Sequence, residues 1–170
     1  MPTPQLTLTA PRTEEDLRIG RRVHGWLRRN GLREADLMYD GNTVQIKYPF
    51  ATREDIQKGL DCMTAWNIAR MRKDPLPPLY AQGVVYRREP MCRIDGRNHF
   101  CEEFLSAHEI YRRGFADCED LSCALSAQYR LRGEPARAVA KPSAVGWHIV
   151  VQRADGTFED PSAKLGMPVP

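Results

Sequence analysis

The last third of the chain constrains the fold most, because a helical pattern is followed there by strand patterns and a tight turn. The helical pattern begins at Cys118, repeats apolar residues three and four positions apart, and ends at Gly133. Strand patterns follow at 136–141, 148–153 and 157–160, with 142–147 as a loop. Ala154-Asp155-Gly156 separates the last two strands as a hairpin turn. The pattern predicts an α+β fold in which the Cys118 helix packs on an antiparallel sheet.

The earlier residues predict a helix–hairpin–helix extension. The expected elements are a helix at 14–31, strands at 37–39 and 44–50, a helix at 53–74, a strand at 80–86, a loop at 87–98 and a helix at 99–113. We expect residues 1–97 to pack as this extension on a core of residues 98–170, within one compact domain. The proline-rich tail at 161–170 is expected to be irregular.

Composition narrows the classes of partner. A net charge of +3 is too small to indicate a protein that binds nucleic acid. The arginines of the first predicted helix are expected to form a solvent-exposed face. No apolar run reaches the roughly 18 residues of a membrane span, and no signal peptide is visible, so we expect a cytoplasmic setting. The five cysteines fit neither a disulfide framework nor a zinc knuckle, and four of them are expected to be buried.

The remaining cysteine, Cys118, has the surroundings of a nucleophile. A helix start concentrates partial positive charge, which favours the thiolate over the thiol. His148 and Asp160 follow on the two strands of the last hairpin. If the hairpin loop has two residues, the residue numbers of each cross-strand pair add up to 309 or 311. The residue facing His148 is then 161 or 163, which is one to three positions from Asp160. A carboxylate at that distance can orient the imidazole, so the three residues predict covalent acyl transfer.

Several blocks around these residues resemble one family. They are Arg113-Gly114-Phe115-Ala116-Asp117-Cys118-Glu119-Asp120, Arg132-Gly133-Glu134-Pro135-Ala136-Arg137, Trp147-His148, Asp155-Gly156 and Asp160-Pro161. In this order they resemble the transglutaminase-like branch of the papain-like cysteine enzymes, over residues 111–167 or a third of the chain. The resemblance implies a papain-like core with a catalytic triad: Cys118 as nucleophile, His148 as base and Asp160 as the orienting acid. The first 95 or so residues show no match to the family's signatures.

The acids around Cys118 carry a further implication. The Asp-Cys-Glu-Asp block resembles bacterial transglutaminase-like cysteine proteinases, some of which depend on calcium. That resemblance makes Asp117, Glu119 and Asp120 candidate calcium ligands, although no cofactor is required for the triad itself. Acids at a helix start also cap it and complement its dipole, and this interpretation is favoured. Trp147 is a candidate substrate contact beside His148, with a core aromatic as the favoured alternative.

Three functions are compatible with these residues. The leading hypothesis is a thiol protease or amidase that hydrolyses a peptide or isopeptide bond of a protein substrate through a thioester. A second is an acyltransferase that uses the same triad to crosslink proteins through lysine. A third, motivated by the unmatched N-terminal half, is a structural or adaptor component of a phage particle or secretion assembly, which would make the chain virion-associated.

An acyl-transfer enzyme also needs hydrogen-bond donors that stabilise the oxyanion. We expect the backbone N–H of Cys118 to be one of them and a group from 80–86 or near Arg112 to be the second.

Overall fold

The computed structural model describes residues 37–39, 43–46, 53–89, 92–94, 97–99, 102–144 and 146–168. Its elements are β1 (Leu37–Tyr39), β2 (Thr43–Ile46), α2 (Arg53–Lys73), η2 (Leu79–Ala81), β3 (Val85–Tyr86), β4 (Cys92–Ile94), β5 (Arg97–His99), β6 (Glu102–Leu105), α3 (Ala107–Arg113), β7 (Phe115–Ala116), α4 (Cys118–Leu131), β8 (Ala136–Ser143), β9 (Gly146–Arg153), β10 (Phe158–Glu159) and α5 (Pro161–Lys164). The predicted helix at 14–31 and the predicted strand residues 47–50 lie outside the described residues.

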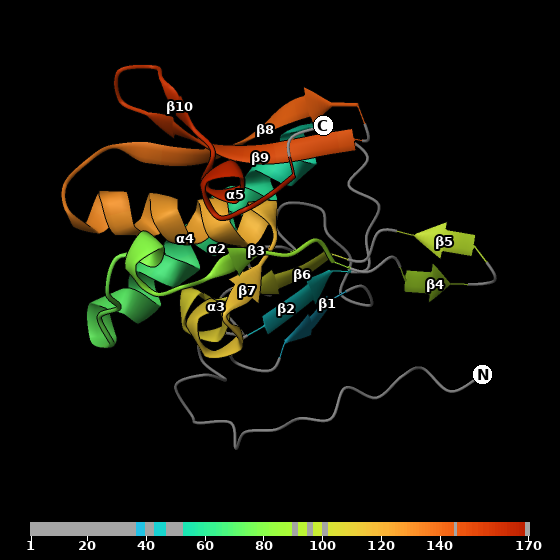
Figure 1. The fold of residues 1–170 in the computed structure, drawn as a ribbon, viewed down its shortest axis with the longest axis horizontal. Helices are drawn as coiled ribbons and strands as arrows, with labels where there is room; N and C mark the ends of the chain where they lie inside the picture. The colour runs from blue at the N-terminus through green and yellow to red at the C-terminus, as the bar shows by residue number, and fades with distance from the viewer. Residues whose placement is uncertain are drawn as a thin grey trace.

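Helix α4 lies at the centre, with helix α2 alongside it and the sheet β10-β9-β8 covering both (Figure 1). Both helices contact one face of the antiparallel sheet, and they also pack against each other. Leu60 of α2, Cys123 of α4 and Ile149 of β9 belong to one hydrophobic cluster. The predicted packing of the Cys118 helix on an antiparallel sheet is therefore confirmed, in a structure that mixes helices and mainly antiparallel strands.

The sequence of α4 explains its central place. Its residues from 119 to 128 are all buried, and many of them are small: Ser122, Cys123, Ala124, Ser126 and Ala127. A helix that is buried on every side belongs in a core, and small side chains let it approach its neighbours closely. Leu121 and Leu125 fill the space toward a second cluster that includes Val151 of β9.

The predicted helix at 99–113 is wrong in its first half, because β6 there belongs to a second sheet, β1-β2-β6. The structure forms β5 and β6 there, and α3 begins only at Ala107. Ser106 caps α3, since its Oγ accepts a hydrogen bond from the N–H of Glu109 at 3.2 Å. Strand β6 forms because β2 supplies an antiparallel partner from far along the chain, which local patterns do not reveal. Strands from both sides of residue 97 thus share one sheet, and β4 occupies part of the predicted loop at 87–98.

The C-terminal hairpins also differ from the prediction. The β8–β9 ladder includes Pro142↔Trp147 and Ser143↔Gly146, so the loop predicted at 142–147 is largely strand. Strand β8 lies at the edge of the sheet, where a proline, which has no N–H to donate, is tolerated. The β9–β10 turn holds three residues, and paired positions sum to 310, as in Phe158↔Gln152, instead of 309 or 311. Helix α5 replaces the start of the predicted irregular tail, with proline at its first position.

Among the helices in the described part of the chain, none combines the length and the apolar character needed to cross a bilayer.

Candidate active site at Cys118, His148 and Asp160

Cys118 is the first residue of α4 and is partly exposed. Strand β7 leads into it, and β7 pairs in parallel with β3, so Tyr86 lies opposite Ala116. Asp117 occupies the N-cap position in an extended conformation, but its side chain makes no capping hydrogen bond. The predicted place of Asp117 at the N-cap, with Glu119 and Asp120 in the first turn, is therefore confirmed, but a capping hydrogen bond from the Asp117 side chain is not formed. The sulfur nevertheless has the predicted place at a helix start, where the first N–H groups have no partner inside the helix.

His148 and Asp160 form a hydrogen-bonded pair. The distance from His148 Nε2 to Asp160 Oδ2 is 2.7 Å, and the two side chains are 22% and 31% exposed. The other oxygen of Asp160 accepts the N–H of Ala163 at 3.0 Å, so Asp160 also caps α5. Because Asp160 engages Nε2, the second ring nitrogen, Nδ1, remains as the one for proton transfer.

Contacts between α4 and β9, and between β3 and α5, place the start of α4 near this pair. Ser122, one helical turn after Cys118, donates a hydrogen bond from Oγ to the carbonyl of Ile149 at 3.0 Å. Ile149 directly follows His148, so the first turns of α4 lie against the beginning of β9, and both elements begin at the same side of the molecule (Figure 1). On the other side, the N–H of Tyr86 bonds to the carbonyl of Leu165 at the end of α5 at 2.8 Å. Strand β3, helix α5 and strand β9 thus surround the start of α4.

The sulfur itself bonds elsewhere in this structure. Its described contact is with Glu119, whose Oε2 lies 3.4 Å from Sγ. Within 102–144 and 146–168, no hydrogen bond joins Cys118 to the ring of His148. The structure therefore joins two of the three predicted residues directly and brings the third near them through the packing of α4 on β9.

Trp147 is exposed beside His148. Its exposure is 42%, and it pairs with Pro142 near the end of the β8–β9 ladder. The favoured interpretation of Trp147 as a core aromatic is therefore wrong. An exposed indole next to the imidazole is available to a ligand.

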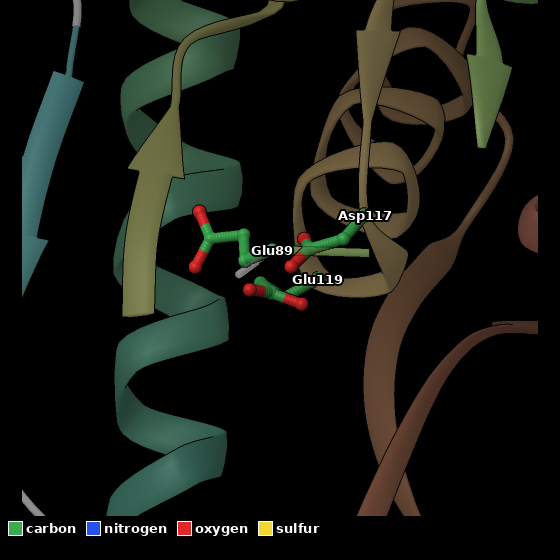
Figure 2. Close-up of side chains that lie close together, drawn as sticks. All are labelled: Glu89, Asp117 and Glu119. Atoms are coloured by element: carbon green, nitrogen blue, oxygen red, sulfur yellow. The ribbon is translucent and has the colours of Figure 1, made fainter. Parts of the chain in front are cut away.

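Three carboxylates gather next to Cys118, and two of them, Asp117 and Glu119, are among the three predicted candidate ligands (Figure 2). Glu89, Asp117 and Glu119 each place one oxygen within 4.8 Å of the others. Asp120 is absent from this group, because its Oδ1 accepts the N–H of Leu105 at 2.7 Å. Glu89 follows β3, and no motif in the sequence connects it to Cys118. Carboxylate oxygens are the ligands that Ca²⁺ prefers, and each of these three residues offers one, so the group supplies part of a calcium shell. The two oxygens of Glu89 also accept the N–H of Glu103, at 3.2 and 3.1 Å.

Tyr86 is the last residue of the segment 80–86, from which a second oxyanion donor was expected. Burial raises its pKa to about 12, and negative charge at Cys118 and Asp117 acts in the same direction. The hydroxyl of Tyr86 therefore stays protonated near the sulfur and can donate a hydrogen bond.

Two other cysteines have the opposite character. Burial raises the pKa of Cys62 to about 12, and it raises the pKa of Cys123 well above its ordinary value. Both thiols stay protonated and unreactive at neutral pH, as predicted for buried cysteines.

No family model, no curated protein and no solved structure matches this chain.

Proposed function

We propose that this protein is a cysteine-dependent amide hydrolase with a papain-like, transglutaminase-like core, acting on a peptide or isopeptide bond of a protein substrate. The observation that supports it most is the His148–Asp160 hydrogen bond of 2.7 Å, near the beginning of β9, the strand on which the Cys118 helix packs. A carboxylate that holds one ring nitrogen fixes the tautomer of the other, which is what a thiol nucleophile requires of its base.

The chemistry takes two steps. His148 Nδ1 takes the thiol proton of Cys118, and the resulting thiolate attacks the amide carbon; a C–S bond forms and the C=O π bond breaks, which leaves an oxyanion. His148 then donates the proton from Nδ1 to the leaving nitrogen, the C–N bond breaks, and a thioester remains. In the second step His148 removes a proton from water, the hydroxide attacks the thioester, and the acid leaves as the thiolate returns.

Two donors near the sulfur suit the oxyanion. The N–H of Cys118 lies at the helix start, where the macrodipole favours negative charge. The hydroxyl of Tyr86 is the second, since strand β3 lies beside β7 and the phenol stays protonated. Trp147 offers an apolar surface to the substrate chain beside the imidazole.

Calcium is part of the proposal as an activator. Glu89, Asp117 and Glu119 would hold the ion, and its charge would offset the carboxylates beside the sulfur and so favour the thiolate. The protein itself supplies the nucleophile, the base and the oxyanion donors.

The test is alkylation of the folded protein with iodoacetamide, followed by mass spectrometry of each cysteine peptide. Cys118 is expected to react first, and Cys62 and Cys123 only after unfolding. His148→Ala should slow the labelling of Cys118, whereas Cys62→Ala should leave it unchanged. Labelling of Cys118 no faster than that of a small free thiol, with the native rate in His148→Ala, would refute a thiolate–imidazole pair.

Turnover is tested with a peptide library and an added amine. Peptide cleavage that is lost in Cys118→Ala supports hydrolysis, and a product heavier by the amine supports transfer to lysine instead. A Cys118→Ala protein that retained its full biological role would favour an adaptor in a particle or secretion assembly.

A further inference from the structure

Glu159 is the residue directly before Asp160, and its carboxylate accepts four side-chain hydrogen bonds. Oε1 accepts hydrogen bonds from the hydroxyl of Tyr80 and from Lys164 Nζ, each at 2.7 Å. Oε2 accepts from the hydroxyl of Tyr129 at 2.7 Å and from an Arg153 guanidinium nitrogen at 3.2 Å. The Glu159 side chain is only 11% exposed.

These four donors come from four different elements. Tyr80 belongs to η2, Tyr129 to the end of α4, Arg153 to the end of β9 and Lys164 to α5. One carboxylate therefore connects the loop after α2, the helix that carries Cys118, the strand that carries His148 and the helix that Asp160 caps. Hydrogen bonds from charged donors are about twice as strong as neutral ones.

The segment around Asp160 is held by tertiary contacts: β10 pairs with β9, Pro161 and Ser162 are buried, and the N–H of Tyr86 bonds to the carbonyl of Leu165. Strand β10 has two residues, and α5 has four. Helices and strands this short are not stable by themselves, so their position depends on tertiary contacts. Directly before Asp160, the carboxylate of Glu159 adds four side-chain hydrogen bonds to these contacts.

We propose that Glu159 is a positioning residue that holds Asp160 in hydrogen-bond contact with His148. The inference about position follows from the contacts alone, and its consequence for catalysis rests on the proposed function. The donors and the positive charge of Lys164 also lower the pKa of Glu159 to about 2, so the carboxylate stays ionised near neutral pH.

Glu159→Gln tests the proposal with almost no change in shape. One oxygen becomes an NH₂ group, which cannot accept a hydrogen bond, so either the Tyr80 side or the Tyr129 side loses its acceptor. Glu134→Gln is the matched control, because Glu134 also binds Arg153, at 2.7 Å, but has no described bond to Tyr80, Tyr129 or Lys164. Tyr129→Phe is a second variant, which removes one bond if Glu159→Gln fails to fold.

The direct measurement is the imidazole N–H signal of His148 by NMR, in protein with nitrogen-labelled histidine. Wild type and Glu134→Gln should show a slowly exchanging N–H at Nε2, and Asp160→Ala should not. In Glu159→Gln or Tyr129→Phe this proton should exchange at least about tenfold faster. Native exchange in a folded Glu159→Gln protein would overturn the proposal.

The kinetic measurement separates this proposal from the proposed function. Labelling of Cys118 should slow by about 10- to 100-fold in Glu159→Gln, since small displacements of a catalytic group have effects of this size. If the N–H signal is lost while labelling is unchanged, Glu159 positions Asp160 but the triad does not activate the thiol. If both are unchanged, Glu159 has no positioning role.

Discussion

Asp120 offers the sharpest test of which acids near Cys118 are structural. Its side chain is almost fully buried, with 1% exposure, and its Oδ1 accepts the N–H of Leu105 at 2.7 Å. This bond ties the first turn of α4 to strand β6. We expect Asp120→Ala to destabilise the fold strongly, because the N–H of Leu105 would lose its acceptor inside the core.

The magnitude follows from the bond and the burial. A buried donor left without a partner costs about 1–3 kcal/mol, and a charged acceptor lies toward the upper end of that range. The cavity left by the carboxylate adds to this, so the total is about 3 kcal/mol. For a chain of this size that corresponds to a fall in melting temperature of about 6–12 °C. Asp120→Asn keeps an oxygen acceptor and should cost only about 1 kcal/mol.

The assay is urea unfolding followed by tryptophan fluorescence, with and without EDTA. Asp61→Ala is the control, because the Asp61–Arg137 ion pair is largely exposed and worth less than about 1 kcal/mol. A loss in Asp120→Ala that disappears when EDTA is added would mean that Asp120 acts as a calcium ligand. A loss no larger than that of Asp61→Ala would refute the structural role.

Two further predictions concern pH and a helix end. The lowered pKa of Glu159 stabilises the fold fully above its unfolded value of 4.5, and this stabilisation is lost as the pH falls toward about 2. After allowance for screening by solvent, we expect wild type to exceed Glu159→Gln by about 1–2 kcal/mol near pH 6 and by little near pH 2, measured by urea unfolding at each pH. A difference independent of pH would contradict this. Gly114 ends α3 with φ of 76° and nothing within 4 Å of an added Cβ, so Gly114→Ala should cost about 1 kcal/mol in thermal melts, purely from backbone strain.

Local signals predicted the part of the fold that carries Cys118. The helix start at 118 and the stop at Gly133 are encoded by residues within one turn of each boundary, so the sequence alone located α4. The hairpin after it was also predicted, but not its three-residue turn, because Gly156 is compatible with more than one turn length.

Contacts distant in the sequence could not be predicted. Strand β6 depends on β2, so a helix was expected where Phe104 and Leu105 form a strand. Glu89 joins Asp117 and Glu119 only because β3 pairs with β7, and no spacing rule connects these residues. The predicted pairing of His148 with Asp160 needed only a hairpin, whereas the approach of Cys118 to them depends on how a helix packs on a sheet.

The hydrogen bond from Ser122 to Ile149 has a consequence for how this site can vary. It occupies the contact between α4 and β9 one turn below the sulfur, where both residues are buried. Only a short side chain fits in this buried contact, so Ser122 helps to set the spacing between the start of α4 and the start of β9. A bulkier residue at 122 would push the two elements apart and change the separation of Cys118 from His148 without replacing either residue.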